Sequence, residues 1–126
     1  MNKAITLTAV VLILISIILG AMAAHALEKV LNSDQIASFE TGVRYTMYHG
    51  LAFLVLGLSA YRLPRLTWVF RLQLAGVILF SGSIFLLSLQ PLLGVSLRFL
   101  GPITPIGGIL MIAGWCVLIV ALFRKN

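Results

Sequence analysis

The chain has 126 residues, of which 61% are hydrophobic and 10% charged, and it has a formal net charge of +6 and a mean hydropathy of +1.14. Soluble domains are about 45–50% apolar and about 25% charged, so this composition excludes an ordinary water-soluble domain. The single cysteine, Cys116, excludes an internal disulfide and with it a small bridge-stabilised secreted scaffold. We therefore expect one membrane domain over residues 1–126.

The first apolar run, residues 4–24, has no charge and is long enough to cross a hydrocarbon core of about 30 Å. Its end contains Ala21-Met22-Ala23, the A-x-A pattern of a signal-peptide cleavage site, so the run has two interpretations. A signal-peptide core has roughly 7–15 apolar residues, and this run is longer and is followed by further apolar runs. The sequence therefore favours a retained helix, with His25 where it leaves the lipid.

The connection after this run predicts a short amphipathic helix at the outer surface. Asn32 and Gln35 have the spacing of a capping box. Apolar residues then recur every three or four positions, at Ile36, Phe39 and Val43, as on one face of a helix. We expect this helix to continue into a second span over residues 43–61.

Two further runs predict the third and fourth spans, over residues 68–90 and 105–123. Thr104 and Pro105 are suited to begin the last helix, as N-cap and first helical residue. The expected fold is an all-α, up-down, left-handed bundle of four transmembrane helices.

Small residues repeat every seven positions within the runs, which predicts close helix contacts in a left-handed bundle. In the first run these residues are Ala9, Ser16 and Ala23. The glycines expected to pack against neighbouring helices are Gly20, Gly50, Gly57, Gly76, Gly82, Gly107, Gly108 and Gly114.

Basic residues predict the orientation. With four spans, both termini and the middle connection lie on one side of the membrane, which has basic and no acidic residues. The charges on the other side sum to zero. The basic residues on the side of the termini are Lys3, Arg62, Arg65, Arg71, Arg124 and Lys125. The positive-inside rule then places both termini in the cytoplasm of a multi-pass protein of the cell membrane, the inner or plasma membrane. Expected partners are anionic lipid headgroups at the cytoplasmic face and a second copy or another membrane protein. The sequence has no basic patch interleaved with aromatic residues, so we expect no nucleic-acid partner.

Few side chains could carry chemistry. The candidates for a ligand site or a polar network are His25, Glu40, Arg44, Tyr45, His49 and Ser83. Glu40 and Arg44 are four residues apart and can pair, as Tyr45 and His49 can stack. The two histidines, expected near the outer boundary, could ligate haem or a metal with Met22 or Met47, but a hydrogen-bonded role is favoured, and we expect no cofactor or metal.

Other residues argue against catalysis. No acidic residue lies within a predicted span, so proton-coupled antiport has no obvious carrier. Ser81 and Ser83 can bond to carbonyls of their own helix, and Cys116 is expected to be a buried, inert thiol. Two functions follow. The favoured one is a non-enzymatic membrane protein that supports membrane or envelope integrity. The alternative is binding or transport of a small apolar or lipid-like ligand in a cavity lined by His25, Tyr45, His49 and Ser83.

Four segments together carry a resemblance: "GAMAAHAL", "FETGVRYTMYHGLAFL", "LFSGSIFLLSL" and "TPIGGILMIAGW". In this order they resemble the YgdD/YwdK family of small bacterial inner-membrane proteins, a family of unknown function. The positions that match the family pattern are Gly20, Ala21, Ala24, His25, Thr41, Gly42, Tyr45, His49, Ser81, Gly82, Ser83, Thr104, Pro105, Gly107 and Gly108. The resemblance implies a four-span fold in a membrane and no particular reaction.

Overall fold

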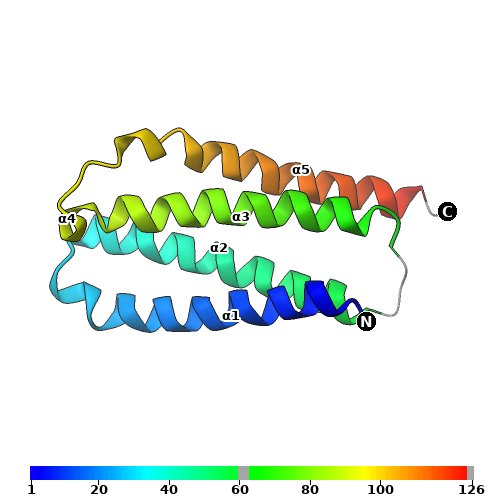
Figure 1. Ribbon diagram of the computed structural model, residues 1–126, viewed down its shortest axis with the longest axis horizontal. Helices are drawn as coiled ribbons and strands as arrows, with labels where there is room; N and C mark the ends of the chain where they lie inside the picture. Colours follow the sequence, from blue (N-terminus) through cyan, green and yellow to red (C-terminus); the bar gives the residue numbers. More distant parts are fainter. Residues whose placement is uncertain (60–62, 125–126) are drawn as a thin grey trace.

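The computed structural model describes residues 1–59 and 63–124, which form four long helices joined by short helices and turns (Figure 1). The long helices are α1 (Lys3–Ala24), α2 (Ser33–Leu58), α3 (Leu66–Ser88) and α5 (Ile103–Phe123). The short ones are η1 (Leu27–Lys29), α4 (Gln90–Leu93) and η2 (Arg98–Leu100). Successive long helices run in opposite directions, as expected for an up-down arrangement. Both termini therefore lie at one end of the molecule, which we call the termini end.

Helix α1 begins at the termini end with an asparagine cap. The Asn2 side-chain oxygen accepts a hydrogen bond from the Ile5 N–H at 3.2 Å. The Asn2 N–H donates to the Gly57 carbonyl at 2.7 Å, near the end of α2. The cap therefore starts one helix and joins it to the end of the next.

Helix α2 begins with the predicted capping box, which is confirmed. The Gln35 N–H donates to Asn32 Oδ1 at 2.9 Å, and the Asn32 N–H donates to Gln35 Oε1 at 3.0 Å. From there one unbroken helix continues to Leu58. The expected continuation of the outer helix into the second span is confirmed. Its first turns do not lie freely at a surface, because Phe39 and its apolar neighbours pack against the end of α1. The expected end of this span, at residue 61, lies outside the described residues.

Three of the long helices are apolar enough to cross a membrane: α1 and α5, with their flanking turns, and α3. Helix α2 is not among them, so the expectation of four spans is not confirmed. Its position explains its lower hydropathy. Helix α2 packs against both α1 and α3, and its polar residues Thr46 and His49 are buried. A helix covered by protein on two sides can carry polar groups that a lipid-facing helix cannot.

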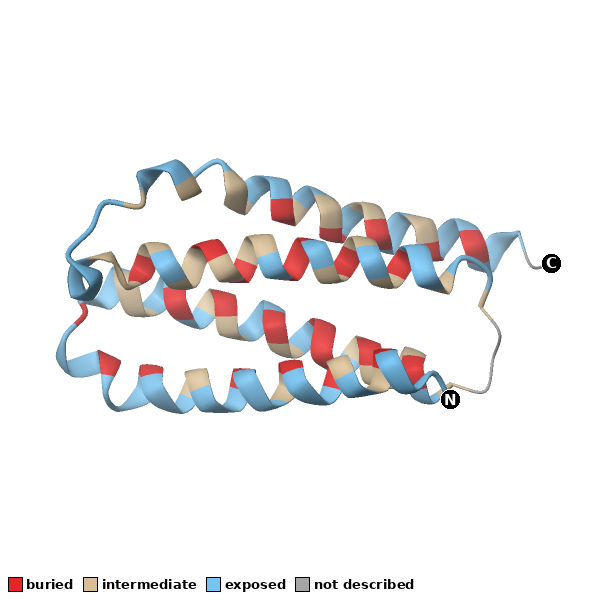
Figure 2. Cartoon of the chain, in the orientation of Figure 1, coloured by how far each residue is buried: buried red, intermediate tan, exposed pale blue. Residues whose placement is uncertain are grey.

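The core lies along α2, and the buried residues occupy the helix faces that are turned toward neighbours (Figure 2). Towards the termini end, Ile5 and Leu12 of α1 pack with Phe53 of α2 and with Phe70 of α3. At the opposite end, Phe39 of α2 packs against Phe85 of α3, with ring centroids 4.9 Å apart. The helix pairs that pack extensively are α1 with α2, α2 with α3, and α3 with α5.

Glycines allow the closest approaches between these helices. A Cβ at Gly57 would lie 2.8 Å from the backbone nitrogen of Thr6 in α1. A Cβ at Gly76 would lie 2.8 Å from the Gly107 carbonyl oxygen, and one at Gly107 would meet the backbone of Phe80. Gly50 similarly approaches Ile13 of α1, and Gly114 approaches Gln73 of α3. At these contacts even an alanine requires a neighbour to move.

Three of the glycines expected to pack against neighbouring helices do not lie at such close contacts. A Cβ at Gly82 would meet nothing within 4 Å, because Gly82 is one residue, about 100° of helix rotation, away from the buried Ser83. The expected packing role of Gly82 is therefore wrong. A Cβ at Gly20 or Gly108 would make only ordinary van der Waals contacts, at 3.5 Å from Val43 and 3.8 Å from Phe80. The seven-residue stripes themselves are buried, as Ala9, Ser16 and Ala23 of α1 show.

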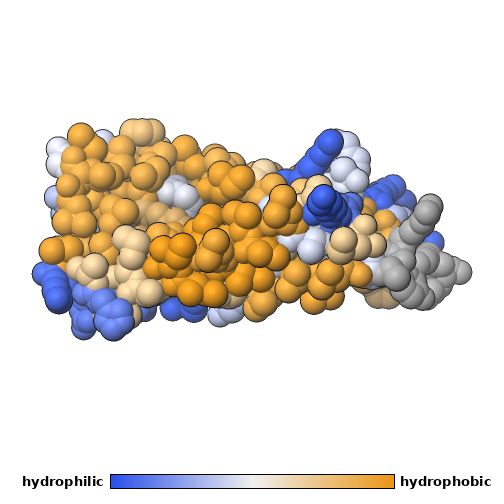
Figure 3. Space-filling model, turned by 60° about the horizontal axis from the view of Figure 1, so that its bottom comes forward, coloured by the Kyte–Doolittle hydropathy of each residue, from blue (hydrophilic) through white to orange (hydrophobic). Residues whose placement is uncertain are grey.

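On the face shown in Figure 3, a broad apolar belt lies between polar side chains toward the two ends of the long axis. Leu7 and Ile17 of α1 are 63% and 58% exposed, and Ile109 and Ile112 of α5 are each 65% exposed. Such continuous exposure of large aliphatic side chains is typical of a surface in contact with lipid.

Candidate functional site

The predicted site residues do not gather at one place. His25 is the C-cap residue of α1, and its side chain is exposed. His49 lies on α2 next to Gly50, which packs against Ile13. Ile13 and His25 are twelve residues apart, about 18 Å along α1. The expectation that the two histidines lie at similar depth is therefore wrong, because α2 begins at Ser33 and places His49 near the middle of the molecule.

His49 joins α2 to α5. Its Nδ1 is 2.9 Å from the Tyr45 carbonyl oxygen, and its Nε2 is 3.3 Å from the indole nitrogen of Trp115. A carbonyl can only accept and an indole N–H can only donate, so both bonds require the neutral imidazole with its proton on Nδ1. The interhelical role expected for a bundle histidine is thus present, and both ring nitrogens have partners.

Tyr45 contributes its ring rather than its hydroxyl to the contacts of this region. The ring lies 4.8 Å from that of Phe80 on α3 and 5.9 Å from that of Tyr48, centroid to centroid. The Tyr45 side chain is 38% exposed, and it is the backbone carbonyl of Tyr45 that bonds His49. The expected stacking of Tyr45 on His49 is replaced by a bond from the imidazole to the helix backbone.

Glu40 and Arg44 do not form the predicted pair. The Arg44 guanidinium donates to the Thr41 hydroxyl at 3.0 Å, and within residues 1–59 and 63–124 no salt bridge joins it to Glu40. Both side chains are exposed, where an ion pair contributes little to stability.

Serine hydroxyls join the other helices. Ser81 Oγ donates to the Gly42 carbonyl of α2 at 2.9 Å rather than to its own helix, contrary to expectation. Ser83 Oγ bonds both the Phe80 carbonyl and, at 2.5 Å, Thr104 Oγ1 of α5. Thr104 is the second residue of α5, which begins at Ile103, so Thr104 is not the N-cap of this helix as predicted.

The residues predicted to line the alternative cavity do not lie together in the described part of the chain. Thr104, the partner of Ser83, and Trp115, the partner of His49, are eleven residues apart on α5, about 16 Å along its axis. Ser83 and His49 consequently occupy different levels of the molecule, and His25 lies apart from both.

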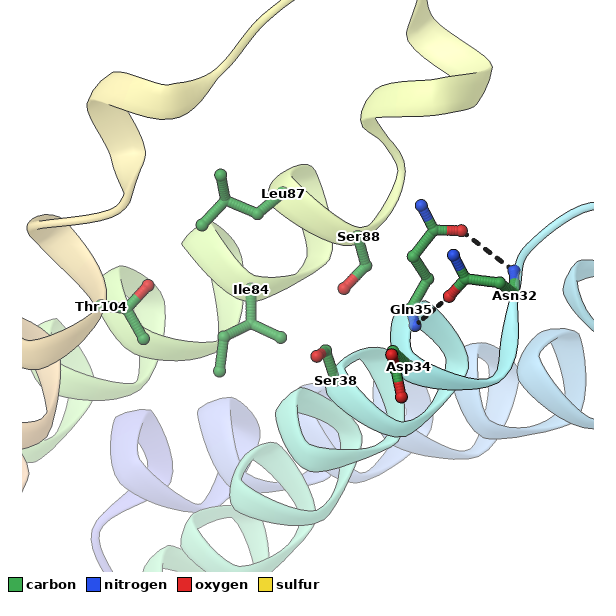
Figure 4. Close-up of a pocket in the computed structure, with 8 residues that line it drawn as sticks. All are labelled: Asn32, Asp34, Gln35, Ser38, Ile84, Leu87, Ser88 and Thr104. Atoms are coloured by element: carbon green, nitrogen blue, oxygen red, sulfur yellow. Dashed lines mark hydrogen bonds between the residues drawn. The ribbon is translucent and has the colours of Figure 1, made fainter.

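A cavity of about 360 Å³ lies instead at the end opposite the termini, between the first turns of α2, the end of α3 and the start of α5 (Figure 4). Its polar side chains include Asp34 and Ser38 of α2 and Ser88 of α3, and its apolar wall consists of Ile84 and Leu87. Sequence reasoning missed Ser88. Its position at the end of the third run was the only available signal.

Three more residues escaped prediction or were placed wrongly. Trp115 had no distinguishing pattern beyond its amphipathic ring. Gln73 is fully buried in α3, and neither its side-chain oxygen nor its nitrogen has a hydrogen-bond partner. Cys116 is exposed on α5 rather than buried, because it lies away from the packing face that contains Gly114 and Leu118.

The described residues contain no group of three or more His, Cys, Asp or Glu side chains that could hold a metal ion. Polar side chains of the helix interiors such as His49, Ser81 and Ser83 bond to other helices, whereas the Gln73 amide and the Ser88 hydroxyl have no hydrogen-bond partner among the described residues. With its apolar belt and polar ends, this arrangement defines a helical membrane protein.

The chain belongs to the family described as "Protein of unknown function (DUF423)", whose model matches residues 19–108. Its relatives include a UPF0382 membrane protein of Staphylococcus haemolyticus, 42% identical over 83% of each chain. The UPF0382 membrane protein YwdK of Bacillus subtilis is 37% identical over 86% of each chain, which confirms the resemblance to YwdK.

A UPF0382 membrane protein of the yeast Schizosaccharomyces pombe is 42% identical over 85% of this chain and 91% of its own. The family is therefore not confined to bacteria, contrary to expectation. No solved structure matches the chain.

Proposed function

We propose that the chain is a non-enzymatic multi-pass protein of the cell membrane that supports membrane or envelope integrity. One observation carries this proposal. His49, Ser81 and Ser83, polar side chains within the helices, bond to other helices and do not face one shared cavity. An active site usually has ionisable groups converging on a pocket. The relatives' names, which state only that they are membrane proteins, agree with this proposal.

We further propose that all four long helices cross the membrane and that both termini are cytoplasmic. Helix α2 runs antiparallel to α1 and α3 along their length, so a bilayer that contains its neighbours also contains α2. The termini end has the basic side chains Lys3, Arg65, Arg71 and Arg124, which are suited to anionic headgroups. Arg62 and Lys125 lie outside the described residues.

The exposed apolar faces of α1 and α5 are suited to lipid and also to a second copy of the chain or another membrane protein. Binding of a lipid-like ligand remains a second candidate function. The cavity beside Ser88, rather than the residues first considered, favours it.

The main proposal is tested by deleting the gene in its host and measuring entry of a membrane-impermeant dye after mild membrane stress. We expect greater dye entry, restored by the wild-type chain but not by Gly107→Leu, in which a large side chain prevents approach of α3 and α5. Ile109→Leu, an exposed aliphatic exchange on the same helix, is the matched control and should restore the barrier. Unchanged dye entry in the deletion strain would contradict the proposal.

A further inference from the structure

Ser88 presents a buried hydroxyl without a partner. The residue is 4% exposed, and its Oγ has no hydrogen-bond partner in the structure. Buried hydroxyls are normally hydrogen-bonded, since leaving one unpaired costs free energy. Ser88 also lines the cavity of about 360 Å³, and in Figure 4 its side chain lies across from Gln35 and Ser38 of α2. Ser88 therefore brings an unpaired hydroxyl to the wall of the cavity.

The other polar groups of the cavity favour a cationic hydrogen-bond donor. Asp34 contributes a carboxylate and Ser38 a second hydroxyl, both from the first turns of α2. No Lys, Arg or His is among the described residues that line the cavity. A carboxylate with two hydroxyl oxygens provides acceptors for an ammonium group, which has up to three N–H donors.

The position of the cavity indicates an amphiphile. Ser88 is the last residue of α3 and Thr104 lies in the first turn of α5, so the cavity lies where two apolar helices end. Phospholipid headgroups occupy that level of a bilayer. Ile84, one turn deeper on α3, and Leu87 form an apolar wall, along which the start of an acyl chain can lie.

We propose that this cavity binds the headgroup of an aminophospholipid. Its primary ammonium donates hydrogen bonds to the Asp34 carboxylate and to the hydroxyl oxygens of Ser38 and Ser88. The inference rests on the proposed placement of α3 and α5 across the membrane.

The test is native mass spectrometry of the purified full-length protein with an equimolar mixture of phosphatidylethanolamine, phosphatidylcholine and phosphatidylglycerol of identical acyl chains. Phosphatidylcholine keeps the positive charge but has no N–H donor. We expect one bound phosphatidylethanolamine, preferred over each other lipid by about fivefold or more, as loss of a charge-assisted hydrogen bond implies.

The variants test the site itself. Asp34→Asn should remove most of the preference, and Ser88→Ala should reduce it. Glu40→Gln is the matched control, because it removes a carboxylate on the same helix that does not line this cavity, and it should keep the preference. Thermal unfolding of each variant verifies that it is folded.

Several results would overturn the proposal: equal binding of phosphatidylethanolamine and phosphatidylcholine, preference for phosphatidylglycerol, or an unchanged preference in folded Asp34→Asn. Competition by millimolar glycerophosphoethanolamine as effective as that by the intact lipid would show that the acyl chains are not recognised, and would also overturn it. None of these results depends on the dye-entry experiment, so the two proposals fail separately.

Discussion

His49 and Trp115 form the side-chain hydrogen bond between α2 and α5, and a double-mutant cycle measures its contribution. We expect His49→Phe and Trp115→Phe each to lower stability in detergent. Their coupling free energy should be about 0.6 kcal/mol and at most about 2 kcal/mol, as for other interhelical bonds in membranes. His25→Ala is the control. The stability losses of His25→Ala and His49→Phe should be additive, since the two histidines lie apart in the structure. Strong coupling between the two substitutions would contradict this arrangement.

Gln73 predicts a stabilising substitution. Its buried amide has no hydrogen-bond partner, so Gln73→Met, which keeps the chain length without the polar atoms, should raise the free energy of unfolding by about 1–3 kcal/mol. Gln90 is the matched control, because its Oε1 accepts from the Leu97 N–H at 2.6 Å and its Nε2 donates to the Leu87 carbonyl at 3.2 Å. Gln90→Met should lower stability. A loss of stability in Gln73→Met would show that the amide has a partner in the protein as it exists in a bilayer.

At the residue scale, the sequence could predict the types of polar residue better than their partners. The spacing of Tyr45 and His49 places them one helical turn apart. The His49 imidazole bonds the Tyr45 carbonyl and the indole of Trp115, and Trp115 is 66 positions further along the chain. Such a partner depends on the register between helices that are not adjacent in sequence. No local pattern contains that register. Ser88 and the cavity beside it were beyond prediction for the same reason.

At the element scale, glycines of one chain predict substitutions of opposite effect. Gly107→Ala should lower stability, since the new methyl group meets the Phe80 backbone. Gly82→Ala should be neutral or slightly stabilising, since its methyl group enters open space and alanine favours the helix by up to about 1 kcal/mol. Thermal unfolding in detergent distinguishes them. Equal losses would show that the contact between α3 and α5 does not limit stability.

The helices themselves were largely predictable, because apolar runs and capping residues are local. The capping box at Asn32 and Gln35 marks the start of α2 correctly. The continuation of this helix into the second span was predicted correctly, and its first turns were expected at the outer surface with Glu40 and Arg44 on one face. Both side chains are indeed exposed, but Phe39 on the opposite face is buried. One helix can therefore have charged side chains on an exposed face and apolar side chains on a buried face.

At the scale of the whole molecule, the proposed topology predicts a pattern of chemical labelling. The exposed Cys116 is first replaced by serine, so that added cysteines can be read singly. A membrane-impermeant thiol reagent applied to intact cells should label Glu28→Cys, on the exposed η1 turn, and should not label cysteines added beside Met1 or Asn126. Labelling of either terminus from outside would reject the orientation. Lysed cells, in which all three sites should react, provide the control.

The central position of α2 has a consequence for biosynthesis. A helix less apolar than its neighbours can enter the membrane together with a neighbour that it packs against. Helix α1 is made first and packs along α2, so we expect the two to insert as a hairpin. In a cell-free translation with membranes, α2 preceded by α1 should become protected from added protease, whereas α2 preceded by an unrelated apolar helix should remain accessible. Equal protection in both cases would mean that α2 inserts unaided, and that its neighbours assemble around it only later.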